Sequence, residues 1–353
     1  MPRRAMGRAG AYLALALLLV AVLVVCVGIG SVAIPLAALL KTLVAPLVNA
    51  LGKLLAIPAW QEFARDLPET WTAIVLRLRL PRVLVAMLAG ANLSLAGGTM
   101  QGLFKNPLAD PYVLGVSSGA AVGAAAAMLA GLGWNVLGAF AIPLAAFVGG
   151  IGSLVLVYSL TGRGGRSTTS VLLAGVAVST FLGAILSLLI YFSGQQIQQV
   201  VFWMMGGFSG RNWWHVLSVL PFLFGGGIVI LWHARELDAL AMGEEQAHYM
   251  GVDVERVKTR LLWASALLAA SAVSVCGLIG FVGLVVPHAM RLIGGPVHRW
   301  LLPAAALAGA AFLPLADLLS RVLLAPRELP VGMITALVGG PFFLYLLKKR
   351  GIA

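Results

Sequence analysis

The stretch "LRLPRVLVAMLAGANLSLAGGTMQGL", residues 78–103, carries arginines at its start and no charged side chain from Val83 to Leu103. A helix that crosses the hydrocarbon core of a bilayer needs about 20 predominantly apolar residues. The charge-free part of this stretch is long enough, and its glycines and other small residues allow neighbouring helices to approach closely. We therefore predict a membrane-spanning helix over residues 83–103.

The composition of the whole chain agrees with this prediction. Of 353 residues, 61% are apolar and only 10% are charged, whereas a soluble domain has about 25% charged residues. A soluble core could not bury so much apolar surface. The composition therefore predicts an all-α polytopic membrane protein, with residues 1–353 forming a single transmembrane domain.

Apolar runs separated by charges, prolines and glycines predict about ten membrane spans. Residues 35–80 contain four prolines and mixed polarity, which favours an amphipathic or partly membrane-dipping connection. The predicted spans are 11–34, 83–103, 112–132, 136–160, 170–193, 214–233, 261–281, a short one at 283–293, 300–320 and 331–347.

The distribution of lysine and arginine predicts the orientation. With ten spans and a cytoplasmic N-terminus, fifteen of the 24 basic residues fall in cytoplasmic segments and nine in outer segments. Cytoplasmic loops of membrane proteins carry an excess of basic residues. Both termini are therefore expected in the cytoplasm, together with the acidic segment 235–260.

That segment, "RELDALAMGEEQAHYMGVDVERVKTR", holds six of the twelve carboxylates of the chain. Helix-forming residues predict one helix from Ala239 to Tyr249, ended by Gly251, with Asp253 capping the next helix. A plain solvated loop is the alternative, since charge is normal in loops. A solvated loop, however, has no need of the apolar residues in the segment, which are Leu240, Met242, Ala247, Tyr249 and Met250.

Ionisable residues inside the predicted spans are rare. Ion-coupled transporters usually carry a functional ionisable residue at mid-membrane. Here Asp317 is the carboxylate near a span interior, and Arg321 follows one helical turn later as an expected i,i+4 partner. The sequence also contains no HExxH motif, no paired catalytic carboxylates and no P-loop, so the chain is not expected to hydrolyse ATP. A stand-alone secondary transporter or channel for a small solute remains the alternative.

Four ordered motifs carry a family resemblance: residues 78–124, "WMMGGFSGRNW" (203–213), "GLIGFVGLVVPHAMRLIGG" (277–295) and "LPVGMITALVGGPFFLYLL" (329–347). With them the chain resembles the FecCD-type permeases, the membrane subunits of ABC importers for ferric siderophores, haem and cobalamin. The resemblance runs from about residue 70 to the C-terminus.

The resemblance implies a type II ABC importer permease fold with ten helices, and a homodimer or a similar heterodimer with the pathway between subunits. It also implies two cytoplasmic ATPase subunits that bind ATP-Mg, a periplasmic or lipid-anchored substrate-binding protein, and no cofactor or metal in this chain. The expected location is a bacterial or archaeal cytoplasmic (inner) membrane, across which a large metal chelate is moved by alternating access.

By motif position, the resemblance assigns ATPase coupling to part of segment 235–260 and binding-protein docking to three arginines. The docking residues are Arg79, Arg82 and Arg321; ordinary snorkelling of interfacial arginines is the alternative. The coupling residues are Ala241, Met242, Gly243, Glu244, Glu245, Ala247, Tyr249, Met250 and Gly251.

Further residues are candidates for the gate and pathway. The resemblance places small hydroxyl residues at the cytoplasmic gate, which here are Ser167, Thr168 and Thr169; N-capping of the next helix explains them nearly as well. Gln195, Met204 and Met205 are candidates for a soft lining of the pathway. An aromatic belt and ordinary packing explain the same region without a ligand.

Overall fold

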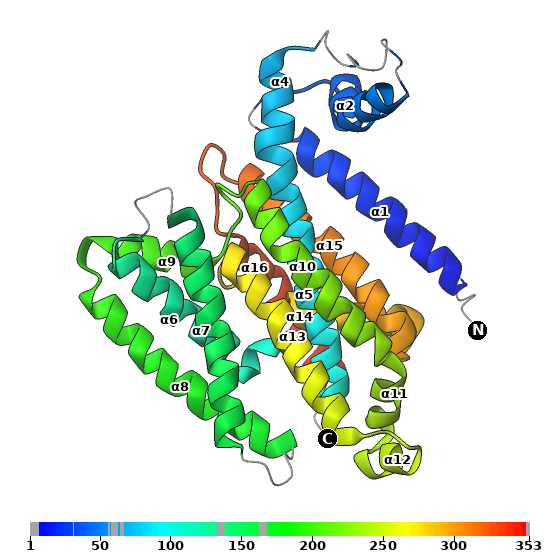
Figure 1. Cartoon of the computed structure of the whole chain (residues 1–353), viewed down its shortest axis with the longest axis vertical. Coiled ribbons are helices and arrows are strands. Elements are labelled where there is room, and N and C mark those ends of the chain that lie inside the picture. The colour runs from blue at the N-terminus through cyan, green and yellow to red at the C-terminus, as the bar shows by residue number, and fades with distance from the viewer. Residues whose placement is uncertain are drawn as a thin grey trace.

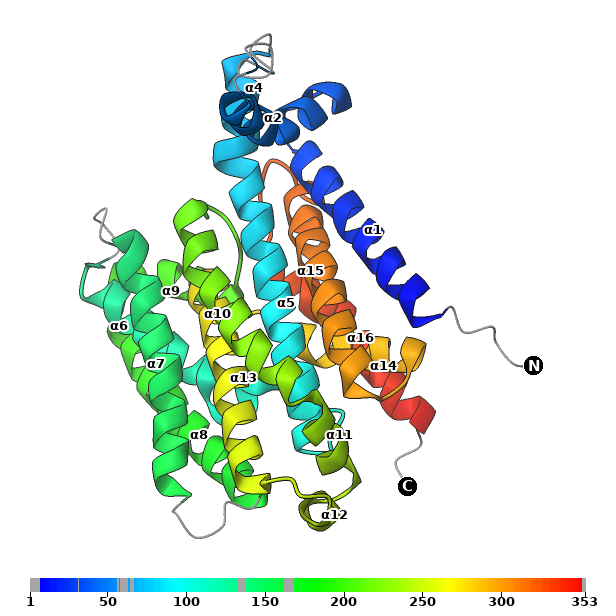
Figure 2. The same cartoon turned by 45° about the vertical axis from the view of Figure 1, so that its right-hand side comes forward.

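The computed structural model describes residues 7–30, 32–55, 57, 63, 67–132, 138–161 and 168–350. Within these ranges the chain folds into helices joined by turns, and no strand occurs in the described part (Figure 1). Long helices run roughly side by side, with α4 and η1 at one end of the bundle and α12 at the other (Figures 1 and 2). We call these the α4 end and the α12 end.

The helices follow one another along the chain as α1 (Arg8–Gly28), α2 (Leu36–Leu54), α4 (Glu69–Ala73), η1 (Ile74–Arg79), α5 (Leu80–Leu103), η2 (Pro111–Leu114), α6 (Val116–Leu129), α7 (Gly138–Leu160), α8 (Thr168–Phe192), η4 (Gly194–Gln196), α9 (Ile197–Met205), α10 (Trp213–Trp232), α11 (Ala234–Met242), α12 (Glu244–Tyr249), α13 (Val254–Cys276), α14 (Val282–Gly294), α15 (His298–Val322) and α16 (Val331–Arg350).

Each of the ten predicted spans coincides with one of these helices, which confirms the polytopic helical fold. By length and apolar composition, eight described helical segments qualify as membrane spans: α1, α2, the continuous stretch from α4 to α5, α7, α8, α10, α13 and α15. The helices α6 and α14 have only 14 and 13 residues. At 1.5 Å per residue they cannot cross a 30 Å core alone. The 3-10 helix η2 precedes α6 inside the bundle, where protein surrounds its irregular backbone.

The helix α2 goes beyond the sequence prediction. Residues 35–80 were expected to form an amphipathic or membrane-dipping connection, and α2 is a 19-residue helix that is long and apolar enough to span. Figures 1 and 2 place it at the α4 end of the bundle, beyond the end of α1 and next to the start of the α4–α5 stretch. The helix α2 therefore extends the α4 end of the bundle and does not lie alongside the other predicted spans.

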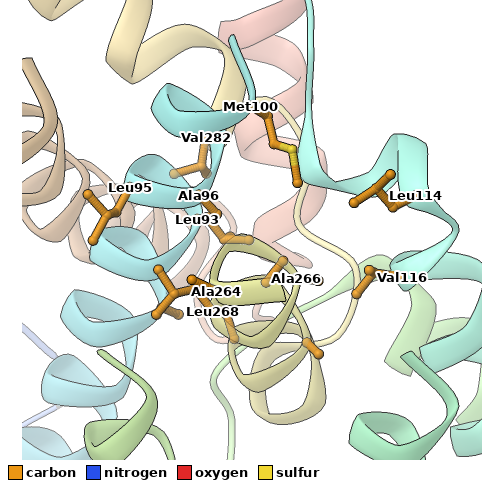
Figure 3. Packing of buried hydrophobic residues seen from close by; sticks show 14 of the residues in the cluster. Leu93, Leu95, Ala96, Met100, Leu114, Val116, Ala264, Ala266, Leu268 and Val282 are labelled. Carbon is orange, nitrogen blue, oxygen red and sulfur yellow. The ribbon is translucent and has the colours of Figure 1, made fainter. Parts of the chain in front are cut away.

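The helix α5 forms the centre of the bundle. Every residue from Ala89 to Leu103 is buried, and α5 packs against α10, α13, α14 and α15. Figure 3 shows Leu93, Leu95, Ala96 and Met100 of α5 close to apolar side chains of α13 and to Val282 of α14. A helix that is apolar on all sides is expected to be buried on all sides. The charge-free stretch at 83–103 forms such a helix.

Glycines set the separation between α5 and its neighbours. A Cβ on Gly90 would collide with the backbone of Gly309 in α15, and a Cβ on Gly97 would collide with the backbone of Gly283 in α14. Small residues at helix contacts let two backbones approach closely, which increases van der Waals packing where lipid provides no hydrophobic driving force. The close approach along α5 therefore depends on these positions.

The helices α6, α7 and α8 form a second group beside α13 (Figure 1). The pair α6 and α7 also meets through small residues, since Gly119 and Gly149 face each other at backbone contact. The outer side of α8 exposes large apolar side chains, among them Phe181 and Tyr191. This side suits contact with lipid or with another membrane protein chain.

We expect Gly97→Ala to lower the free energy of unfolding by about 1–3 kcal/mol, because the added methyl group forces α5 and α14 apart. Gly225→Ala is the matched control, since no atom lies within 4 Å of a Cβ at that position in α10. Thermal unfolding of the detergent-purified variants measures the difference. A melting temperature of Gly97→Ala equal to that of Gly225→Ala would contradict the packing argument.

Candidate functional site

The predicted coupling segment forms two short helices at the α12 end. The prediction of one uninterrupted helix from Ala239 to Tyr249 is wrong, because α11 ends at Met242 and α12 begins at Glu244. Gly243 between them has φ 152°, a conformation that residues with a Cβ rarely adopt. We call residues 234–251 the coupling knob.

Both expected boundaries beyond this break are confirmed. Gly251 has φ 84° and follows the end of α12. The carboxylate of Asp253 accepts a hydrogen bond from the backbone N–H of Arg256 at 3.3 Å and so caps α13. The coupling knob is therefore a compact turn of two helices with a fixed exit into α13.

Apolar side chains and one ion pair hold the coupling knob against the bundle. Leu237, Leu240 and Ala247 are buried in the main core. Lys258 Nζ of α13 lies 3.0 Å from Glu244 Oε1. Glu244, one of the predicted coupling residues, thus joins α12 to α13 within the chain.

A second polar contact joins the coupling knob to α15. Asp238 Oδ1 accepts a hydrogen bond from the backbone N–H of His298 at 2.8 Å and lies 2.6 Å from His298 Nδ1. An acidic side chain at a helix N-terminus satisfies a free N–H group and interacts favourably with the helix dipole. These two residues are 60 positions apart, so local sequence patterns gave no sign of the contact.

The coupling knob also presents an apolar surface away from the bundle. Met242 is 73% exposed, Tyr249 80% and Met250 55%. Glu245 is exposed beside them and accepts a 3.4 Å hydrogen bond from Tyr249 Oη. Of the nine predicted coupling residues, Gly243 and Ala247 face inward and the others are exposed. Exposed apolar patches rimmed by polar residues mark interaction surfaces.

At the α4 end, Arg82 forms the centre of a charge cluster. Its guanidinium binds Asp317 with Nη2–Oδ1 at 2.8 Å and Nε–Oδ2 at 3.1 Å. It also binds Glu328 with two contacts of 2.9 Å. Arg321 Nε lies 3.1 Å from Asp317 Oδ2, as the i,i+4 spacing predicted. The side chain of Asp317 is fully buried, whereas that of Glu328 is 42% exposed.

The other contacts of the predicted docking arginines are backbone carbonyls. Arg79 donates to the carbonyl oxygens of Val27, Gly28 and Val32 at 2.7–3.1 Å and is itself buried. Arg321 donates to the carbonyl oxygens of Cys26 and Ile29. The structure thus gathers Arg79, Arg82 and Arg321 at one end, each with partners inside the chain, and their role in docking stays a prediction. Glu328 was missed, because it lies 246 positions from Arg82.

The pathway candidates lie on η4, on α9 and at the start of α8. Gln195 lines a hollow of about 660 Å³ together with other polar residues of η4 and α9. Met204 and Met205 end α9, and Met204 packs against a small buried cluster that includes Val273. Among the gate candidates, Thr169 is exposed at the start of α8. Ser167 and the side chain of Thr168 lie outside the described residues, and the pathway roles stay predictions.

An all-helical membrane bundle with a rigid knob at one end and an arginine cluster at the other has the architecture of a transport permease. The family model described as the FecCD transport family matches residues 17–349, and the chain belongs to this family of ABC transporter permeases.

Among its relatives, the cobalamin import system permease protein BtuC of Halobacterium salinarum is 47% identical over 81% of this chain and 76% of its own length. The hemin transport system permease protein HmuU of Yersinia pestis is 45% identical over 78% of this chain and 84% of its own. A solved inward-facing structure of an ABC transporter assigned to the metal-chelate type superposes with a TM-score of 0.80 at 30% identity, covering 96% of this chain and 98% of that chain.

We expect Asp317→Asn to destabilise the protein by about 3–5 kcal/mol, because it leaves two largely buried arginines without their shared charge partner. Glu328→Gln removes a carboxylate from the same Arg82, but at a partly exposed position where solvent screens the pair. It should cost about 1 kcal/mol or less. Thermal unfolding in detergent compares the two variants. Equal losses of stability would show that the burial of a carboxylate does not determine how strongly it stabilises this cluster.

Proposed function

We propose that this chain is the permease subunit of a type II ABC importer that moves a large metal chelate (cobalamin, haem or a ferric siderophore) into the cell. Family membership supports the class of transporter. The named relatives support the class of cargo, because their names specify cobalamin and hemin.

The observation that carries this proposal is the coupling knob. Its exposed side, Met242, Tyr249 and Met250, offers contact area to a separate protein. Its inner side is tied to α13 through Glu244 and to α15 through Asp238. A force applied to the exposed side is therefore transmitted to two core helices and not absorbed by a loop. Two ATPase subunits that bind ATP-Mg supply this force, since the sequence has no P-loop of its own.

The arrangement of the ends supports an orientation with both termini in the cytoplasm. The start of α1, the end of α16 and the coupling knob lie toward the same end of the bundle (Figures 1 and 2). In the sequence, the segments assigned to the cytoplasm hold fifteen of the 24 basic residues, the excess that is typical of cytoplasmic loops. The α4 end then faces outward in a bacterial or archaeal cytoplasmic membrane, where a substrate-binding protein docks on its arginines.

A second copy of the chain completes the pathway. The exposed apolar side chains of α8, with Leu337 and Leu344 of α16, provide a surface that lipid or a partner subunit can cover. A pathway between two permease subunits allows outward and inward openings to alternate. Docking and nucleotide state must each favour one of these conformations, because a ligand shifts an equilibrium only through differential affinity.

The competing function, a secondary transporter or channel that works alone, requires a group that binds a coupling ion. Asp317 was the carboxylate near a span interior, and it is held by Arg82 and Arg321. A carboxylate in this arrangement is neutralised by its own protein and does not serve as an ion site. Asp317 is therefore not available as the ion site that this competing function requires.

Reconstitution tests the proposed function. Proteoliposomes that contain the permease with its ATPase subunits should take up a chelate only when the binding protein and ATP-Mg are both present. A panel of cobalamin, haem and a ferric siderophore identifies the cargo. Equal uptake by the permease without any ATPase would overturn the importer assignment.

We expect Met242→Asp to reduce ATP-driven uptake more than tenfold, because it places a charge in the exposed apolar contact surface of the coupling knob. The permease itself should keep its melting temperature, since Met242 is exposed. Met242→Leu keeps the apolar surface and is the matched control, with uptake close to that of the wild type. Uptake in Met242→Asp equal to that in Met242→Leu would remove this surface from the coupling mechanism.

A further inference from the structure

Arg211 occupies a cavity at the α4 end that the proposed mechanism does not use. It lies in the connection between α9 and α10, and its side chain lines a cavity of about 200 Å³. Arg82 and Glu328 line the same cavity from the start of α5 and from the connection before α16. Apolar residues also line it, among them Phe202 and Val331.

The guanidinium of Arg211 has no hydrogen bond or ion pair with any described residue. The Nε atom of Arg211 is buried and has no hydrogen-bond acceptor. Only the backbone N–H of Arg211 donates a hydrogen bond among the described residues, to the carbonyl oxygen of Phe208. The three arginines assigned to docking differ from it, because each of them is bonded to carboxylates or carbonyl oxygens. Arg211 is partly exposed, and a charge that is partly removed from water without a partner is unfavourable, so an external anion that binds it would stabilise the site.

The positive charges around the cavity outnumber the negative ones, and Arg211 is the arginine without a carboxylate partner. Asp317 serves both Arg82 and Arg321, and Glu328 serves Arg82. Two carboxylates thus face three arginines in and beside the cavity. Burial lowers the pKa of Arg211, and the nearby charge of Arg82 lowers it further. A guanidinium nevertheless stays protonated in proteins, so the cavity keeps a positive charge that an anion can neutralise.

The backbone around Arg211 is fixed by hydrogen bonds to three parts of the bundle. Gly207 N donates to the carbonyl oxygen of Cys276 at the end of α13, and Val331 N donates to that of Gly206 at 3.0 Å. Asn212, which follows Arg211, accepts from Trp214 N and caps α10. The backbone that carries Arg211 is therefore fixed before any ligand arrives, which reduces part of the entropy cost of binding.

We propose that Arg211 and its cavity form an oxyanion-binding site for a single carboxylate or phosphate group. The planar fork of arginine binds such groups through two parallel hydrogen bonds. A volume of about 200 Å³ is below the about 300–1,000 Å³ of sites that enclose a whole small molecule, so the site takes one functional group and not a complete chelate. The group belongs to an acidic side chain of the binding protein or to the cargo, and this part of the proposal rests on the proposed function.

The purified permease tests the site without any partner. Acetate and inorganic phosphate, added at constant ionic strength, should raise the melting temperature of the wild type by a few degrees through preferential binding to the folded state. Arg211→Gln should lose this rise. Without added anion, Arg211→Gln should melt at or above the temperature of the wild type, because it removes an uncompensated charge.

Arg77→Gln is the matched control, since it removes one exposed positive charge at the same end of the bundle. It should keep the anion-dependent rise, whereas Arg211→Lys should retain only part of it because it lacks the fork. An equal rise in the wild type and in Arg211→Gln, or no rise in either, would overturn the proposal.

Docking measurements then separate the two sources of the oxyanion. If the binding protein supplies it, Arg211→Gln should weaken docking of the empty and the loaded binding protein alike, by about tenfold or more. If the cargo supplies it, docking of the empty binding protein should stay unchanged and that of the loaded one should weaken. Unchanged docking in both cases would overturn the proposal. Failure of the importer assignment would be seen separately, as wild-type uptake that does not need ATP.

Discussion

The burial of α5 on all sides is the constraint on which the rest of the structure depends. Its glycines bring α14 and α15 to backbone contact, and its apolar side chains fill the space toward α13. The two ends of α5 then reach both clusters described above, because Arg82 belongs to its first turn and Gly102 near its end lies against Leu237 and His298. One rigid helix thus connects the arginine cluster with the coupling knob.

The helix α15 makes the same connection through charged groups. Asp317 near one end binds Arg82 of α5, and the N-terminus at the other end is capped by Asp238 of the coupling knob. Of these charged groups, Asp317 is fully buried, so its pairing with Arg82 is little screened by solvent. Together α5 and α15 form one packed unit that reaches from the arginine cluster to the coupling knob.

The features that could be predicted from sequence depend on local patterns. The apolar stretches predicted the helices, the i,i+4 spacing predicted the pair Asp317–Arg321, and Asp253 was recognised as a cap. The break at Gly243 was missed, because glycine inside a run of helix formers costs only about 1 kcal/mol and does not always end a helix. The contacts of Glu328 and Asp238, and the lack of a partner for Arg211, arise from tertiary packing between segments far apart in the chain, on which local patterns carry no information.

The partners of Arg79, Arg82 and Arg321 also bear on the docking role proposed above, in which an acidic side chain binds these arginines. Each of the three already binds partners within the chain, so a new carboxylate competes with an existing partner. Displacing the fully buried Asp317 would leave a charge without water or cation, whereas displacing the partly exposed Glu328 from Arg82 returns that carboxylate to solvent. An exchange of one carboxylate for another gives little net free energy, which favours weak and reversible docking. Arg211 lines one cavity together with Arg82 and Glu328 and has no partner among the described residues that must be displaced. It therefore offers an incoming carboxylate an attraction that the exchange at Arg82 does not supply.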